Sequence, residues 1–168
     1  MAISKYDRDL TEFLLTKKAE IFLLGNHKDK SPFFQAINSQ SIWAIELLCD
    51  HGANVMNTSI SGMNPLIYAA SRGFDEICMY LSLRTKDVDV EDTFTGKTTF
   101  FIYMQKKDLL RMKQLLMRGS DINYMSSKRG QTALHYAVQK KYPVKIIKFL
   151  INSGANPHIE DKHGKDCC

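Results

Sequence analysis

The sequence predicts an all-α solenoid of stacked helix–turn–helix pairs. The first observation is a regular internal repeat, whose four units are marked by Ala36, Ala69, Tyr103 and Ala137. The second is that every marker lies in one short apolar segment and is followed by another, such as "VKIIKFLINSGANPHI" at positions 144–159. Two such short segments are not stable alone, so each must bury its apolar face on neighbouring repeats.

Turn and capping residues recur at the same period and define the ends of the expected helices. Seven positions before each marker stands a residue suited to a tight turn, occupied by Asp29, Gly62, Gly96 and Gly130. The expected N-caps are Ser31, Asn64, Thr98 and Thr132, and Pro32 and Pro65 fit the first helical turn. Gly52 and Gly154, each in a "GAN" triplet, supply the glycine expected where a second helix ends.

The spacing within the second segments predicts which of their residues are buried. In "IIKFLI", Ile146, Ile147, Leu150 and Ile151 fall on one helical stripe, which we expect to face the core. The third unit departs most from the pattern, because Tyr103 replaces a small marker and Lys107 stands where the second unit has Gly73. We expect that unit to be irregular but still helical.

The stretch "GQTALHYAV", positions 130–138, resembles the ankyrin repeat motif, as do "GMNPLIYAASRG" and "LLCDHGANVMN". The resemblance covers nearly the whole chain and implies an ankyrin-repeat solenoid. It further implies that His135 is structural, bonding to backbone near the turns. It also implies a binding role, in which turn tips and the exposed positions of the first helices meet a partner.

The repeat register predicts a single domain over residues 1–168. A half-repeat, 1–25, contains one helix near Asp9 to Thr16, and full repeats follow at 26–58, 59–92, 93–126 and 127–160. A fifth repeat starts at 161–168, where Cys167 and Cys168 occupy the positions of Pro and Leu in the motif. Because the final apolar helix would be left partly uncovered, we expect the natural chain to continue past Cys168.

Composition and motifs argue against several classes of protein. The chain has no apolar run long enough for a membrane span, and residues 1–13 do not have the pattern of a secretory leader, so we expect neither a leader nor membrane insertion. Cys49 and Cys78 lie in apolar helical patterns, which favours a reducing, cytoplasmic location. We expect no enzyme activity, no cofactor and no metal. A zinc site from His158, His163, Cys167 and Cys168, or lipid attachment at the last two, is a weak alternative.

Positive charge is concentrated at the turn tips and at the ends of the first helices. The net charge is +5, and 10 of the 23 residues at these positions are Lys or Arg, whereas none is Asp or Glu. We expect the charged side chains to face solvent and the apolar tips to supply anchors. The candidate partner-binding residues are Lys28, Lys30, Ile60, Met63, Arg72, Phe94, Lys97, Lys106, Lys128, Arg129, Lys140 and Lys162.

These observations predict a non-enzymatic interaction scaffold whose basic concave face binds an acidic protein surface or tail. One alternative is an N-terminal targeting module of a longer protein with its activity beyond residue 168. Nucleic-acid binding is a further alternative, which the lack of an aromatic ladder disfavours.

Overall fold

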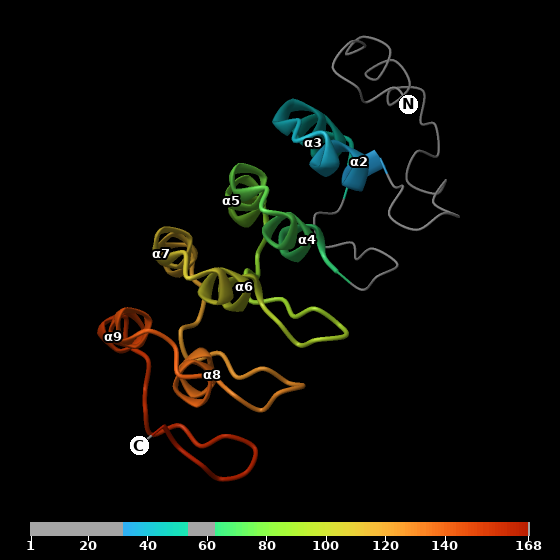
Figure 1. Ribbon diagram of the computed structural model, residues 1–168. Helices are drawn as coiled ribbons and strands as arrows, with labels where there is room; N and C mark the ends of the chain where they lie inside the picture. Colours follow the sequence, from blue (N-terminus) through green and yellow to red (C-terminus); the bar gives the residue numbers. More distant parts are fainter. Residues whose placement is uncertain (1–31, 54–62, 168) are drawn as a thin grey trace. The chain divides into compact units, whose positions relative to one another are not determined.

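The computed structural model describes residues 32–53 and 63–167 and consists there of short helices joined by turns (Figure 1). The chain forms two compact units, Met1–Thr85 and Lys86–Cys168. In the first, α2 (Pro32–Asn38) packs on α3 (Ile42–Asp50), and α4 (Pro65–Arg72) packs on α5 (Asp75–Arg84). In the second, α6 (Thr99–Lys106) packs on α7 (Leu109–Met117), and α8 (Ala133–Gln139) packs on α9 (Val144–Asn152).

These helix pairs confirm the predicted all-α class, since the described residues include no strand. The helix expected near Asp9 to Thr16, the cap at Ser31 and the turn at Gly62 lie outside the described residues. The single-domain organisation and its repeat boundaries stay predictions. None of the helices within residues 32–53 and 63–167 is long and apolar enough to cross a membrane.

Side-chain caps begin the first helix of three repeats, as the sequence predicted. The side-chain oxygens of Asn64, Thr98 and Thr132 each accept a hydrogen bond from the backbone N–H three residues later, at 2.7, 3.3 and 3.4 Å. Pro65 follows its cap as the first helical residue. Each cap satisfies one N–H that has no partner within the helix, so the start of each of these helices is fixed locally.

One residue per repeat adopts a left-handed conformation where the first helix ends. The four residues stand four positions after the markers: Gln40 (φ 52°), Gly73 (φ 80°), Lys107 (φ 58°) and Lys141 (φ 51°). Only one of them is the glycine that this conformation favours. The third repeat is therefore as helical as the others, and its Lys107 takes the backbone geometry of a glycine.

The marker residues form the centre of the helix packing. Ala36, Ala69, Tyr103 and Ala137 have no exposed area. Tyr103 fills space that an alanine leaves to neighbouring side chains elsewhere, so the bulky marker is accommodated without loss of the helix pair. In α9, Ile146 and Leu150 are buried as expected and Ile147 is half-buried, whereas the expectation for Ile151 was wrong, because 49% of it is exposed.

A buried carboxylate joins the segment after α5 to the loop after α7. Asp89 accepts hydrogen bonds from the hydroxyl of Ser120 at 2.5 Å and from the N–H of Asp121 at 2.6 Å. Burial raises the pKa of Asp89, and the two hydrogen bonds oppose that shift. The carboxylates of Asp87 and Asp121 raise the pKa further. The ionised form is thus held in a site that favours the neutral form.

We predict that Lys107→Gly stabilises the protein. The substitution removes the clash between Cβ and backbone at positive φ, which costs about 1–2 kcal/mol, although the greater freedom of glycine in the unfolded chain offsets part of it. The denaturation midpoint should rise, by about 0.5–1 kcal/mol in unfolding free energy. The control is Lys106→Gly, which replaces the last residue of α6 and should destabilise. Equal changes in unfolding free energy for the two variants would contradict the proposed backbone strain at Lys107.

We predict that Asp89→Asn removes a pH dependence of stability. Because the folded pKa is raised, the stabilisation from Asp89 is fully present below its unfolded pKa of about 3.9 and is lost as pH rises through the folded value. Asn can accept from Asp121 and donate to Ser120. The variant should therefore gain in unfolding free energy relative to wild type between pH 3 and pH 7, measured by urea denaturation. A constant difference across that range would be evidence against the prediction.

Candidate functional site

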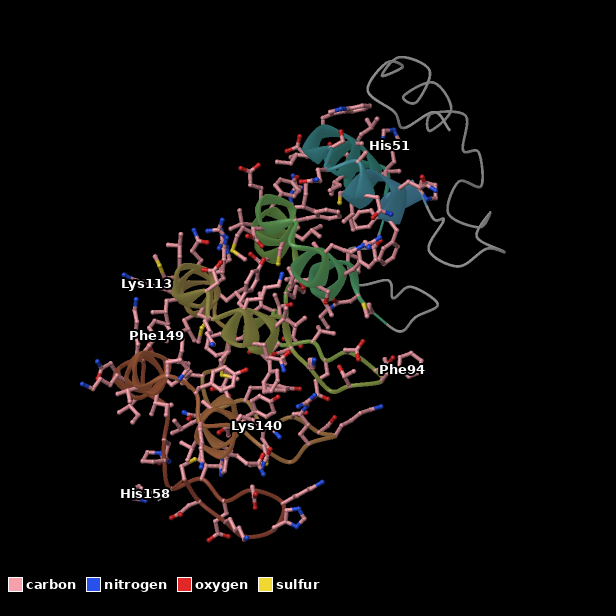
Figure 2. The ribbon with its side chains drawn as sticks, viewed as in Figure 1. His51, Phe94, Lys113, Lys140, Phe149 and His158 are labelled. Carbon is pink, nitrogen blue, oxygen red and sulfur yellow. The ribbon has the colours of Figure 1, made fainter. Side chains whose placement is uncertain are left out.

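The hairpin before α6 presents an exposed aromatic ring at its tip. The Asp92 carboxylate accepts hydrogen bonds from the N–H groups of Phe94 at 3.2 Å and Thr95 at 2.5 Å. The backbone of Asp92 closes the turn by bonding Gly96 and Lys97, both at 2.8 Å. The side chain of Phe94 is 70% exposed, and Figure 2 shows it at the end of the hairpin. The carboxylate of Asp92 therefore bonds within the turn, whereas the apolar ring of Phe94 points outward.

Lysines occupy the same tip position in the next two hairpins. Lys128 and Lys162 follow Phe94 by one and two repeat periods, and both are exposed. Each packs over the glycine of the preceding hairpin, so that a Cβ added to Gly96 would lie 2.8 Å from Cβ of Lys128. The same atom added to Gly130 would lie 2.4 Å from Cβ of Lys162. Glycine is thus required for successive tips to stack this closely.

Arg129 lies against two aromatic rings of the first helices. Its guanidinium carbon is 4.8 Å from the ring centroid of Phe101 and 5.5 Å from that of Tyr136. The two rings meet edge to face at 4.6 Å, and the Tyr136 hydroxyl accepts a 3.3 Å hydrogen bond from Gln105. Arg129 also donates from Nε to the carbonyl of Thr95 at 3.1 Å. Cation–π attraction and this hydrogen bond fix the arginine on the rings.

The unit Met1–Thr85 contains the same arrangement. Phe34 and Tyr68 meet edge to face at 5.1 Å, and the Tyr68 hydroxyl donates to Asn38 Oδ1 at 2.7 Å. Arg72 lies over the Tyr68 ring at 5.5 Å. Neither cluster was predicted from the sequence. The available signal was the recurrence of Phe, an amide and Tyr after two repeat periods, at positions 34 and 101, 38 and 105, and 68 and 136.

The predicted binding residues differ in how far they are exposed to solvent. Lys106, Lys128, Lys140 and Lys162 are exposed in the unit Lys86–Cys168. The expectation that every charged side chain faces solvent was wrong for Lys97 and Arg129, which are half-buried. In the other unit Arg72 is exposed and Met63 is half-buried. Lys28, Lys30 and Ile60 lie outside the described residues.

A carboxylate also holds the last hairpin together. Asp161 accepts hydrogen bonds from the N–H of Lys165 at 3.1 Å and of His163 at 2.8 Å, and these bonds hold its pKa below the usual value. Asp161 thus accepts backbone hydrogen bonds within its hairpin, as Asp92 does. Both acids thus direct oxygens to backbone N–H groups of their own hairpins, whereas Lys128 and Lys162 are exposed at the tips.

His135 acts within the fold, as the resemblance implied. Its Nδ1 lies 2.7 Å from the Thr132 hydroxyl and accepts from the Thr132 N–H at 3.3 Å, which completes a capping box. Its Nε2 is 3.1 Å from the carbonyl of Lys165 in the next hairpin. Over residues 32–53 and 63–167 no group of three His, Cys, Asp or Glu side chains could hold a metal ion.

Comparisons with known proteins match the chain to ankyrin repeats. A family model of ankyrin repeats in three copies matches residues 1–93 and 81–161. A putative ankyrin repeat-containing protein of Treponema pallidum is 31% identical over 132 residues, which cover 79% of this chain and 44% of that protein. The 2-5A-dependent ribonuclease of Mus musculus is 43% identical over 61 residues, covering 36% of this chain and 8% of the ribonuclease.

The fold is also similar to a solved structure, the ankyrin repeat domain of Bcl-3. The TM-score is 0.79 at 22% identity, and the match covers 94% of this chain and 70% of that one. The chain spans less than half the length of the two curated relatives named above.

We predict that Gly130→Ala destabilises the protein more than Gly164→Ala. Both glycines have left-handed φ angles, 60° and 72°, so the conformational cost is similar. A methyl group at 130 would overlap Lys162, whose N–H is bonded to the Gly130 carbonyl at 2.9 Å, whereas at 164 the nearest atom is 3.8 Å away. The additional loss should be about 1–3 kcal/mol by chemical denaturation. If the two variants unfold at the same midpoint, the hairpins are not packed as described.

Proposed function

Because the chain belongs to the ankyrin repeat family, we propose that it is a non-enzymatic scaffold that binds an acidic protein partner through a basic face. Ankyrin repeats are generally protein–protein interaction modules, and stacked repeats leave their tips and inner helices available for partners. The basic face is defined by Phe94, Lys97, Lys106, Lys128, Arg129, Lys140 and Lys162.

The observation that supports this proposal is that the acidic and basic side chains of the hairpins lie in different places. Asp92 and Asp161 bond to backbone within their turns, whereas Lys128 and Lys162 are exposed at the tips, where the Lys128 ammonium donates to the Thr93 carbonyl of the preceding hairpin. An electropositive surface of this kind steers an acidic partner and accelerates its association. Phe94 adds apolar area that charge alone does not supply, as expected of a central contact in a protein interface.

The aromatic clusters favour a protein partner over nucleic acid. Binding of single strands relies on aromatic faces that are free to stack on bases. Phe101 and Tyr136 meet edge to face instead, and the Arg129 guanidinium lies over both rings. Phe101 is buried as a result. These rings therefore support the geometry of the face and are not available to bases.

A second candidate function is that of a targeting module within a longer protein. It is favoured by the length of the relatives, since the matched segment covers 44% of one and 8% of the ribonuclease. In that case the basic face would recruit a partner or substrate to an activity held elsewhere. For either function we infer a reducing, cytoplasmic environment. Burial of Cys78, whose thiol donates to the Leu66 carbonyl, is consistent with that.

We predict that Lys128→Glu, Lys140→Glu and Lys162→Glu together weaken binding of an acidic, leucine-containing peptide by about tenfold or more. The side chains are exposed, and Glu retains the Cβ and Cγ atoms that lie over the glycines. The exposed bond from Lys128 Nζ to the Thr93 carbonyl is lost, so the melting temperature should fall only slightly. Arg129 is left intact because it packs on the rings. Titration calorimetry at low and physiological salt measures the affinity.

The matched control is Lys113→Glu, Lys145→Glu and Lys148→Glu on α7 and α9, which removes the same charge elsewhere and should bind the peptide almost normally. Salt should weaken binding without abolishing it, and Phe94→Ala should lower the part that salt leaves. Equal affinities of the two triple variants would refute the proposal. Competition by duplex DNA would favour the nucleic-acid alternative.

A further inference from the structure

The outward faces of α7 and α9 carry matching apolar residues. Leu110 and Met117 on α7 are 60% and 79% exposed, and Val144 and Ile151 on α9 are 64% and 49% exposed. The members of each pair are separated by two helical turns, which places both on one face of their helix. The second pair follows the first by one repeat period, so it occupies the same repeat positions. Four aliphatic side chains thus point outward in a regular two-by-two arrangement.

Lysines separate these apolar residues. Lys113 lies between Leu110 and Met117, and Lys148 lies between Val144 and Ile151, with Lys145 beside them. The exposed residues of α7 and α9 include no Asp or Glu. We define the outer patch as Leu110, Lys113, Met117, Val144, Lys145, Lys148 and Ile151.

The loops that follow α7 and α9 are hydrogen-bonded to each other. Asn123 donates from its side chain to the Gly154 carbonyl at 3.3 Å and accepts from the Asn156 N–H at 2.8 Å. The two helix ends are therefore adjacent, and Figure 1 shows the helices as neighbours on the same side of their unit. The four apolar residues therefore lie on the outward faces of two neighbouring helices of this unit.

The outer patch is separate from the basic face. Figure 2 shows Lys113 on the outer side of α7, whereas Phe94 lies at the hairpin tip on the opposite side of the same unit. Asp108, at the start of α7, turns its carboxylate to the N–H of Arg111 at 3.0 Å. That acid therefore caps the helix. The patch retains a net positive charge.

We propose that the outer patch binds the surface of an anionic phospholipid bilayer. Aliphatic residues on a helix face enter the boundary between headgroups and acyl chains, while lysines on the same face reach the anionic headgroups. Each lysine near such a surface adds favourable electrostatic energy. Binding is peripheral and requires no spanning helix. It extends beyond the proposed function and does not depend on it.

The interleaving of charge and apolar side chains favours a bilayer over a protein partner. The centre of a protein interface is depleted in lysine, because burying an ammonium group requires a fixed counter-charge. In the outer patch Lys113 and Lys148 occupy the middle of each apolar pair. A fluid layer of anionic headgroups supplies counter-charges to both lysines without a fixed partner geometry. The aliphatic side chains are removed from water at the same time.

The test is flotation of the purified protein with vesicles of phosphatidylcholine alone or with phosphatidylserine. Wild type should float with the anionic vesicles only. Lys113→Glu with Lys148→Glu should lower the partition coefficient about tenfold or more. Leu110→Ser with Ile151→Ser should lower it as well while net charge is unchanged. These residues are exposed, so circular dichroism and thermal melting should match wild type.

The matched control is Lys86→Glu with Lys165→Glu, two exposed lysines outside both surfaces, which should float as wild type does. The outer-patch variants should also keep wild-type affinity for the acidic peptide, so failure here is distinguishable from failure of the proposed function. Absence of flotation would overturn the proposal, as would equal flotation of all variants. Binding of an acidic amphipathic peptide at the patch without vesicle binding would assign it to a protein instead.

Discussion

The close approach of successive hairpins at a glycine determines much of the unit Lys86–Cys168. The Ser126 hydroxyl donates to the Gly96 carbonyl at 2.7 Å, and the Lys162 N–H donates to the Gly130 carbonyl at 2.9 Å. Neither glycine has room for a Cβ, and both have positive φ. Hydrogen bonds at this distance fix one hairpin on the next, so the spacing of the tips follows from backbone geometry. The side chains at the tips are then free to vary without disturbing the core.

The same constraint explains why two different surfaces coexist on one small unit. Each repeat buries its marker residue and the inner sides of both helices, which uses most of its apolar residues. The hairpin tips and the outward side of the second helix remain exposed on opposite sides. In this chain the tips carry Phe94, Lys128 and Lys162, and the outward side carries aliphatic residues separated by lysines. The chemistry of the two surfaces can therefore differ although a single repeat geometry produces both.

Arginine–aromatic clusters link the repeats through side chains as well. In each unit a phenylalanine of one repeat meets a tyrosine of the next, an amide group bonds the tyrosine hydroxyl and an arginine covers the ring. The arginine comes from the helix end at Arg72 but from the hairpin at Arg129. Two positions in the chain thus supply the same cation–π contact. Arg129 consequently packs on the rings as well as adding positive charge to the face proposed to bind a partner.

The sequence by itself determined the features that depend on local chemistry. The caps at Asn64, Thr98 and Thr132 and the helical third repeat follow from short-range spacing and the repeat period, and the structural role of His135 follows from the resemblance to the ankyrin repeat motif. Only the tertiary structure decided which side chains meet across repeats. It paired Arg129 with Phe101 and Tyr136, buried part of Lys97 and exposed Ile151, since these outcomes depend on the distance between elements of successive repeats. A period predicts where a residue stands in its repeat, whereas contacts with the next repeat decide whether it is covered.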